Sequence, residues 1–139
     1  MIDDGYRYSE IDPSVLLARF GNLDNAQDGL NFKTENCNLI QAAEFKYPTG
    51  HVMRAHRHIE RTPPEKFRTE EVLLVWKGAV LCTIYELNDY PRIERILNPG
   101  NYVIVHNGGV SYEVLEDDTI LLEVKSGPFT TSEGDRVLL

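Results

Sequence analysis

Three of the four histidines of this chain fall within the stretch GHVMRAHRH, residues 50–58. His56 and His58 are separated by one residue, so on a β-strand their side chains point to the same face, with Cα atoms about 6–7 Å apart. Two imidazoles in this arrangement can bind one divalent metal ion, or can act as general acid and base on a substrate. The competing interpretation is a pair of ordinary surface histidines. His51 is expected at an exposed turn.

Glu71 and Arg54 could complete such a site. Glu71 stands directly before the apolar run VLLVW, where an acidic side chain is unusual for core packing but natural at the mouth of a barrel. It is the candidate third ligand, because a metal needs more than two protein ligands. Arg54 shares the predicted face of His56 and could bind a carboxylate or phosphate of a substrate. A salt bridge with Glu71 is its structural alternative.

The composition is that of a single globular domain. The chain has 139 residues, of which 42% are hydrophobic, and a formal net charge of -8. This charge makes nucleic acids and anionic membranes poor partners, and no apolar run approaches the ~18 residues of a membrane-spanning helix. Cys37 and Cys82 form no CxxC motif, and the N-terminus is acidic and polar, unlike a signal peptide. We therefore expect a cytoplasmic protein with two reduced thiols, a single disulfide being the alternative.

The elements that must position these residues are mostly short strands. One short helix is expected at residues 13–20, because Asp12-Pro13 is typical of a helix start and Gly21 of a helix end. From residue 31 onwards, β-like runs are separated by turn signals, which predicts an all-β sandwich or barrel. These runs are residues 38–47, 51–59, 71–76, 79–87, 92–97, 101–106, 110–115 and 119–125.

The chain is accordingly divided into three parts. These are an N-terminal arm with the short helix (1–30), a β-barrel (31–129) and a mobile or interfacial C-terminal tail (130–139). Two of the runs, EVLLVW and TILLEV, are apolar at successive positions, so both faces of these strands should be covered. In a protein of two sheets the second cover is often a partner subunit, which favours a homodimer.

The spacing of the candidate site residues resembles the first motif of the cupin superfamily, G-x5-H-x-H followed by E-x6-G. Gly50, His56 and His58 match its first half, and Glu71 and Gly78 match its second half. The resemblance implies a double-stranded β-helix, or jelly-roll barrel, with the histidines and the glutamate in its interior.

Further blocks are similar to a group of small cupin-like proteins that are often associated with bacterial polysaccharide genes. The blocks RTEEVLLVWKG, LNPGN, NGGVSYEVLE and EVKSGPF carry this likeness, which spans about residues 36–129. The spacer at 59–70 is longer than in most cupins and looks like an inserted loop. The likeness implies dimers with exchanged N-terminal arms, and it implies no settled biochemical role.

The second cupin motif, G-x5-P-x-G-x2-H-x3-N, is matched only at Gly100 and Gly108. Its histidine, the third histidine ligand of the family, is replaced by Val110 in the closer alignment or by Ser111 in the general one, and its proline is replaced by His106. The four-ligand site that the resemblance implies is therefore incomplete.

Three outcomes follow from the incomplete motif. His56, His58 and Glu71 could hold Fe, Mn, Zn or Ni alone, because two histidines and one carboxylate with open positions form non-haem Fe(II) sites. His106 could reach in as a substitute ligand, which requires an altered loop. In the third outcome the protein is metal-free, and its histidines serve as acid–base groups or polar contacts.

Tyr85, Tyr102 and Tyr112 are candidate ligand-binding residues, because aromatic rings with a polar tip suit sugars; core packing is the alternative for each. The barrel is thus predicted to bind a small polar molecule, either sugar-derived or a carboxylate. One hypothesis is an isomerase, epimerase or lyase that uses a metal, or that uses the two histidines with Arg54 in its absence. The other is a non-catalytic ligand-binding or accessory protein with a degenerate metal site.

Overall fold

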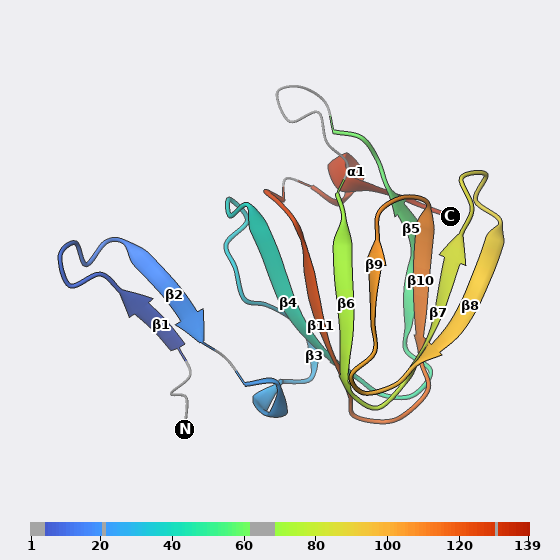
Figure 1. Ribbon diagram of the computed structural model, residues 1–139, viewed down its shortest axis with the longest axis horizontal. Coiled ribbons are helices and arrows are strands. Elements are labelled where there is room, and N and C mark those ends of the chain that lie inside the picture. The colour runs from blue at the N-terminus through green and yellow to red at the C-terminus, as the bar shows by residue number, and fades with distance from the viewer. Residues whose placement is uncertain (1–4, 21, 62–68, 130) are drawn as a thin grey trace.

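The fold consists almost entirely of β-strands, arranged in two five-stranded antiparallel sheets that face each other (Figure 1). It is seen in a computed structural model that describes residues 5–20, 22–61, 69–129 and 131–139. The all-β class and the jelly-roll barrel predicted from the sequence are confirmed. The described helical segments are short, namely η1 (Leu23–Asn25) and α1 (Ser132–Asp135).

One sheet carries the two candidate histidine ligands, and we call it the histidine sheet. In spatial order its strands are β12 (Arg136–Leu138), β5 (Val52–His58), β10 (Gly109–Val114), β7 (Val80–Tyr85) and β8 (Pro91–Leu97). The other sheet carries Glu71, and we call it the glutamate sheet. In spatial order its strands are β3 (Gly29–Phe32), β4 (Ile40–Tyr47), β11 (Thr119–Ser126), β6 (Glu71–Lys77) and β9 (Tyr102–Val105).

The core lies between the two sheets and is built by simple alternation. In β6, Leu73 and Val75 are fully buried, while Val72 and Leu74, which alternate with them, are part-exposed on the outer face. Alternation likewise places Tyr112 and Val114 of β10 inside. Because side chains of a strand point to opposite faces in turn, Glu71 at the start of β6 points inward with Leu73.

The glycine that ends the first motif closes the hairpin between β6 and β7. Gly78 has a φ of +79°, a region of backbone space that residues with a Cβ rarely adopt. A Cβ at this position would also collide with Thr119 at the start of β11. Glycine therefore lets this turn pack directly against the neighbouring strand of the glutamate sheet.

The N-terminal segment forms a β-hairpin, so the predicted helix at residues 13–20 is wrong. β1 (Gly5–Tyr8) pairs antiparallel with β2 (Leu16–Phe20). Asp12 does cap a turn, since its side chain accepts a hydrogen bond from the backbone N–H of Ser14 at 3.0 Å. The chain leaves this turn as a strand, because pairing with β1 satisfies the backbone groups that a helix would otherwise satisfy.

The described part of the C-terminal segment, residues 131–139, is paired into the barrel, so it is not the mobile tail that the sequence allowed at 130–139. Helix α1 leads directly into β12, which pairs with β5 at the edge of the histidine sheet. In this pairing Arg136 lies opposite His58. A three-residue strand is too short to leave a periodic signal in the sequence.

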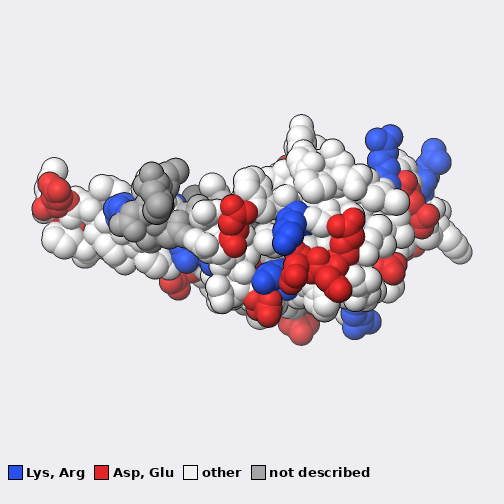
Figure 2. Space-filling model, turned by 90° about the horizontal axis from the view of Figure 1, so that it is seen from below, with Lys and Arg blue, Asp and Glu red and all other residues white. Residues whose placement is uncertain are grey.

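The outer face of the glutamate sheet is apolar and part-exposed. Strand pairing sets its apolar side chains in two rows across the sheet, and we call this set the outer apolar face. The first row is Ala42, Val124, Val72 and Ile104; the second row is Leu122, Leu74 and Tyr102, with Trp76 beyond it. The hairpin of β1 and β2 projects away from the barrel (Figures 1 and 2) and exposes further large hydrophobic side chains, among them Tyr8, Leu17 and Phe20.

Two sequence predictions fall on parts of the chain that are not described. Most of the inserted loop predicted at 59–70 lies outside the described residues, as does the beginning of the N-terminal arm, residues 1–4. Within the described ranges, no helix is long and apolar enough to cross a lipid bilayer.

Candidate functional site

A bulge in β5 sets the direction of its side chains. Met53 pairs with Tyr112 and His56 pairs with Val110, so three steps along β5 match two steps along β10. Such a bulge shifts the alternation of side chains by one residue, which allows both Met53 and His56 to be directed to the interior. Arg54 falls on the bulge; its side chain is exposed, yet it lines the same cavity as His56.

His56, His58 and Glu71 meet in the barrel interior from opposite sheets. The Nε2 atom of His58 lies 2.9 Å from Oε2 of Glu71, and that of His56 lies 3.9 Å from the same oxygen. The ligand atoms of the three residues all lie within 4.8 Å of one another. The side chains are 8%, 4% and 2% exposed, so the interpretation of the histidines as surface residues is wrong.

The hydrogen bond of His56 leaves its Nε2 atom free. Its Nδ1 atom lies 2.8 Å from the backbone carbonyl of Arg54. Because a carbonyl oxygen only accepts hydrogen bonds, Nδ1 carries the proton of the neutral ring and Nε2 carries the lone pair. This is the tautomer that a histidine needs to bind a metal through Nε2.

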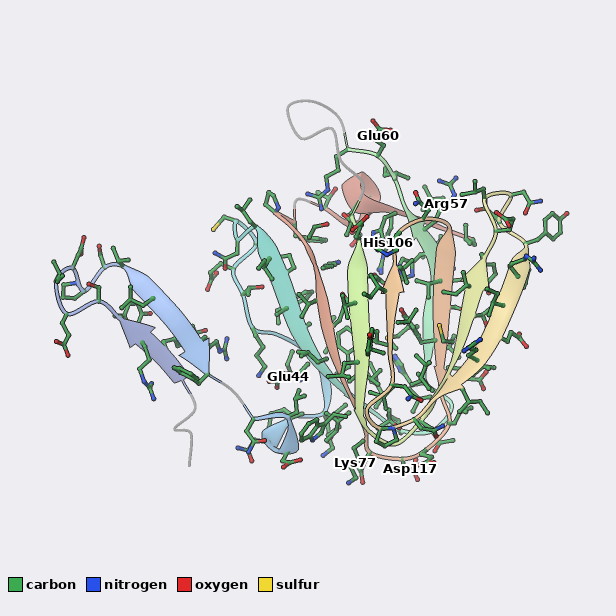
Figure 3. The ribbon with its side chains drawn as sticks, viewed as in Figure 1. Glu44, Arg57, Glu60, Lys77, His106 and Asp117 are labelled. Atoms are coloured by element: carbon green, nitrogen blue, oxygen red, sulfur yellow. The ribbon has the colours of Figure 1, made fainter. Side chains whose placement is uncertain are left out.

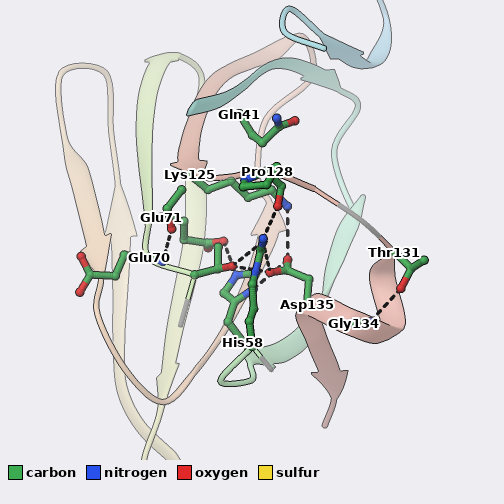
Figure 4. A network of polar contacts seen from close by, with 12 residues as sticks. Gln41, His58, Glu70, Glu71, Lys125, Pro128, Thr131, Gly134 and Asp135 are labelled. Carbon is green, nitrogen blue, oxygen red and sulfur yellow. Dashed lines mark hydrogen bonds and ion pairs between the residues drawn. The ribbon is translucent and has the colours of Figure 1, made fainter. Parts of the chain in front are cut away.

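His58 lies between two carboxylates (Figure 4). Its Nε2 atom contacts Glu71, and its Nδ1 atom lies 3.1 Å from Oδ2 of Asp135. Burial lowers the pKa of His58, but the hydrogen bonds and charges of Asp135 and Glu71 outweigh burial and raise this pKa to about 9. In the metal-free protein His58 is therefore a charged imidazolium at neutral pH.

The two carboxylates shift in the opposite direction. Burial raises the pKa of Glu71, yet the imidazoles of His56 and His58 beside it bring this pKa well below its ordinary value. Burial also raises the pKa of Asp135, and its contacts with His58 and Thr69 bring it below its ordinary value in the same way. Both carboxylates are therefore ionised, and they supply the negative charge that a bound cation requires.

Tyr112 and Val110 of β10 adjoin the two histidines. The hydroxyl of Tyr112 donates to Oε1 of Glu71 at 3.2 Å, which leaves Oε2 of that carboxylate facing the imidazoles. Val110 is 1% exposed, stands opposite His56 in the strand pairing and packs in the core. In the closer alignment, an apolar side chain thus fills the place of the third histidine.

A cavity of about 420 Å³ opens beside His56. Tyr112 and Asp135 also line it, so the cavity and the candidate metal site share a wall. Part of the wall is apolar and part is charged, a combination typical of sites for small polar ligands. The apolar part includes Phe45, Tyr47, Met53 and Phe129, and the charged part includes Arg54, Glu123, Lys125 and Arg136.

Glu123 and Lys125 of β11 also line the cavity beside His56. Their charged groups lie 4.0 Å apart on the inward face of β11, and Nζ of Lys125 lies 3.6 Å from Asp135. Burial, followed by the charge of Glu71, raises the pKa of Glu123 to about 7. A carboxyl group that titrates near neutral pH can both accept and donate protons.

Asp135 is a site residue that the sequence prediction missed. The carboxylate is 1% exposed at the end of α1, in the segment assigned to a tail. The sequence near Asp135 contains one local signal. Thr131 is typical of a helix N-cap, and its side chain accepts a hydrogen bond from the backbone N–H of Gly134. That signal predicts a helical turn, but it does not reveal what the turn packs against.

His106, Tyr102 and Tyr85 do not reach the site. The side chain of His106 is 62% exposed, and its Nδ1 atom lies 3.3 Å from a carboxylate oxygen of Glu70, at the upper end of the barrel in Figure 3. Its predicted role as a substitute ligand is therefore wrong. Tyr102 is exposed on the outer apolar face, and the hydroxyl of Tyr85 contacts Ser111 at 3.2 Å. Neither tyrosine lines the cavity beside His56.

The donor set fits a divalent metal ion. With ligand bonds of about 2.0–2.2 Å, neighbouring ligand atoms around one ion lie roughly 3 Å apart, close to the separations between Glu71 and the two histidines. Two imidazole nitrogens and one carboxylate oxygen suit Fe, Mn, Zn or Ni. On metal binding, His58 would lose the proton on Nε2. The proton on Nδ1, which faces Asp135, would stay on the imidazole ring.

The structure resembles solved structures, although no protein-family model and no curated protein matches the chain. A variant of oxalate decarboxylase from Bacillus subtilis matches 74% of the chain with a TM-score of 0.57 and 16% identity. KdgF from Halomonas sp. matches 73% with a TM-score of 0.54 and 21% identity. CapF of Staphylococcus aureus, a capsular polysaccharide assembling protein, matches 79% with a TM-score of 0.59 and 16% identity.

These likenesses concern the fold. The chain spans 25% of the oxalate decarboxylase chain and 34% of CapF, but 83% of KdgF. All of these neighbours are cupin-fold proteins, and this chain has the cupin fold, as its first motif predicted.

Proposed function

We propose that this protein binds a divalent metal ion through His56, His58 and Glu71, and a small polar ligand in the adjoining cavity, as an isomerase, epimerase or lyase. The observation that supports this proposal is the convergence of three buried ligand groups at the wall of a 420 Å³ cavity. Two imidazole nitrogens and a carboxylate oxygen this close together form a donor set that divalent transition metals bind.

The ligand that best suits the cavity is sugar-derived or a carboxylate. Arg54, Lys125 and Arg136 line the cavity and would bind an anionic group of the ligand. Aromatic walls, such as that of Phe129, would pack against the apolar face of a sugar ring. The structural likeness to CapF, a capsular polysaccharide assembling protein, agrees with a sugar-derived ligand.

The chemistry would be proton transfer beside a polarised carbonyl. A metal bound here supplies a Lewis acid that polarises a ligand carbonyl. Glu123, whose pKa is about 7, would remove or return the proton on the neighbouring carbon. Without a metal, the free Nε2 of His56 would act as the base, and Arg54 would hold the anion.

An alternative proposal is a non-catalytic ligand-binding or accessory protein. The observation that favours it is Val110, whose buried apolar side chain stands where the family places a ligand. A site with one ligand fewer binds metal more weakly. The open cavity agrees with ligand binding in either case.

Metal binding is tested first. The protein is stripped with chelator, dialysed against Mn²⁺, Fe²⁺, Zn²⁺ or Ni²⁺, and analysed by elemental analysis and calorimetry. One ion per chain is expected, with loss of binding in His56→Ala and Glu71→Gln. His106→Ala removes an exposed histidine of the same barrel and should bind as the wild type does. No bound ion in the wild type, or equal loss in His106→Ala, would contradict the metal proposal.

Catalysis is tested by exchange of hydrogen with solvent. The protein is incubated in D₂O with a panel of keto sugars and sugar acids, and deuterium uptake next to the carbonyl is followed by NMR. An isomerase or epimerase that works by proton transfer incorporates deuterium, and Glu123→Gln should slow the exchange. Ligands that shift the melting temperature without any exchange would favour the accessory protein.

We further propose a homodimer in which partner chains cover each other's outer apolar face. The support is that this face is left part-exposed, while the projecting hairpin of β1 and β2 also exposes hydrophobic side chains. An isolated two-stranded hairpin is marginally stable in water, so it gains by packing against a second copy. A cytoplasmic location agrees with the free thiols Cys37 and Cys82.

A further inference from the structure

Asp135 is a buried carboxylate with ion-pair partners at one oxygen and hydrogen-bond donors at the other (Figure 4). Its Oδ2 atom lies 3.1 Å from Nδ1 of His58 and 3.6 Å from Nζ of Lys125. Its Oδ1 atom lies 3.1 Å from Nη2 of Arg61 and accepts a hydrogen bond from the hydroxyl of Thr69. With 1% of the residue exposed, these contacts are shielded from water.

The C-terminal segment fixes where this carboxylate stands. The carbonyl of Asp135 accepts a hydrogen bond from the backbone N–H of Ile59 at 2.9 Å, directly after His58. The next residue, Arg136, is the strand partner of His58 in the pairing of β12 with β5. The backbone of Asp135 is therefore tied to the strand that carries the two histidines.

We propose that Asp135 is a positioning residue of the metal site, which keeps a proton on Nδ1 of His58 and so leaves Nε2 for the ion. A carboxylate only accepts hydrogen bonds, so the nitrogen facing it must carry a proton. Metal-binding histidines are commonly oriented by a group on their other nitrogen. The inference rests on the proposed metal site, because it assigns Asp135 a role toward the ion held by His56, His58 and Glu71.

A purely structural role for Asp135 must be separated from this one, because Arg61 and Thr69 share its other oxygen. Asp135→Asn keeps the shape, but the amide group can donate to Nδ1 of His58. The imidazole then keeps its proton on Nε2, where the ion should bind. We expect affinity for Zn²⁺, measured by calorimetry, to fall about 10- to 100-fold.

Two matched variants serve as controls. Glu133→Gln makes the same change of charge on the exposed side of the same helix, and it should leave the affinity within about threefold of the wild type. Thr69→Val removes the hydroxyl that contacts the other oxygen of Asp135. It should lower the melting temperature, while Zn²⁺ affinity stays within about threefold, because His58 keeps its partner.

A second readout does not depend on metal. Long-range ¹H–¹⁵N NMR spectra of the stripped proteins report which ring nitrogen of His58 is protonated. A proton on Nδ1 is expected in the wild type and in Thr69→Val, and its loss is expected in Asp135→Asn.

The outcomes distinguish the two proposals. If the wild type binds Zn²⁺ and Asp135→Asn binds it equally well, the positioning role is wrong and the metal site stands. An equal loss of affinity in Thr69→Val would assign the effect to structure and would also overturn the positioning role. If the wild type binds no Zn²⁺, the metal proposal fails and the role toward an ion fails with it; the NMR spectra then still show whether Asp135 sets the protonation of His58.

Discussion

Val110 stands directly opposite His56 in the pairing of β10 with β5, and its side chain is buried against the barrel core. The distance between paired residues of adjacent strands is short enough for their side chains to share one ligand. This pairing therefore gives a position at which a further histidine ligand could be introduced.

Val110→His should strengthen metal binding. The new imidazole would face the interior beside His56, and we expect at least about tenfold tighter binding of Zn²⁺ or Ni²⁺, because coordination would be more complete. Without metal the variant should be less stable by about 1–3 kcal/mol, since a polar ring replaces a packed valine. Calorimetry and urea unfolding with and without metal measure both effects.

Ser111→His is the control for this gain. Ser111 is the motif histidine position in the general alignment, but in the strand it follows Val110 and contacts Tyr85 instead of the site. The Ser111→His variant should bind metal with the affinity of the wild type. If both variants gained affinity equally, an added histidine at either position would explain the result, and the position of Val110 would not matter.

Glu123→Gln should stabilise the protein at alkaline pH. Burial and the charge of Glu71 raise the pKa of Glu123 from 4.5 to about 7, so the folded state binds the proton more tightly than the unfolded state does. Ionisation therefore opposes folding, with a penalty that grows between pH 4.5 and 7 and is complete above pH 7. The substitution should raise the free energy of unfolding by on the order of 1–3 kcal/mol at pH 8.

At pH 4.5 the same substitution should have little effect, because the carboxyl group is then protonated in the folded protein. Urea unfolding of metal-stripped protein at both pH values measures the difference. Glu113→Gln, at an exposed position of β10, should change stability by the same small amount at each pH. A gain for Glu123→Gln that does not depend on pH would contradict the raised pKa.

Ile104→Glu should weaken the proposed homodimer. Ile104 is 46% exposed on the outer apolar face and is paired with Val72 across the sheet. A charge there would be buried on association, which costs several kcal/mol if it is unpaired. Light scattering should give twice the chain mass of 15.9 kDa for the wild type and a lower value for the variant at micromolar concentration.

The matched control for the dimer is Val137→Glu. Val137 is similarly exposed, at 39%, but lies on β12 of the histidine sheet, opposite Arg57. This variant should remain dimeric. A wild type that is monomeric at all concentrations would contradict the proposal that the outer apolar face is a dimer interface.

The two thiols should differ in reactivity. Cys37 is exposed, whereas Cys82 is 3% exposed, and burial followed by the charge of Glu71 raises the pKa of Cys82 to about 11. Because the thiolate is the reactive form, a thiol reagent at pH 8 should label Cys37 rapidly and Cys82 only on unfolding. Cys37→Ser should abolish the rapid phase; a rapid phase that persists would place Cys82 within reach of solvent.

The parts of the site that were predictable are those with fixed local spacing. His56 and His58 are two residues apart on one strand, and Glu71 and Gly78 define the start and end of another. Alternation along a strand then suffices to direct the side chains inward. The same rule does not show the irregularity at Arg54, because a bulge depends on how β5 pairs with β10, which the sequence of β5 does not encode by itself.

The contribution of Asp135 was not predictable for a related reason. Its carboxylate contacts His58 of β5, more than half of the chain away in sequence, and no local pattern signals such a contact. The helix predicted at 13–20 failed similarly. Asp12 caps a turn that could open either a helix or a hairpin, and pairing with β1 decides for the strand.

The position of β12 at the edge of the histidine sheet determines where a recombinant fragment of the protein can end. A recombinant fragment cut at the barrel limits that the sequence suggests, 31–129, would lack the edge strand beside β5 and the carboxylate that faces His58. It would also expose the backbone hydrogen-bonding groups of β5, which invites aggregation. An inert or insoluble product from that fragment would reflect the cloning boundary, and screening for substrates belongs with the full 139 residues.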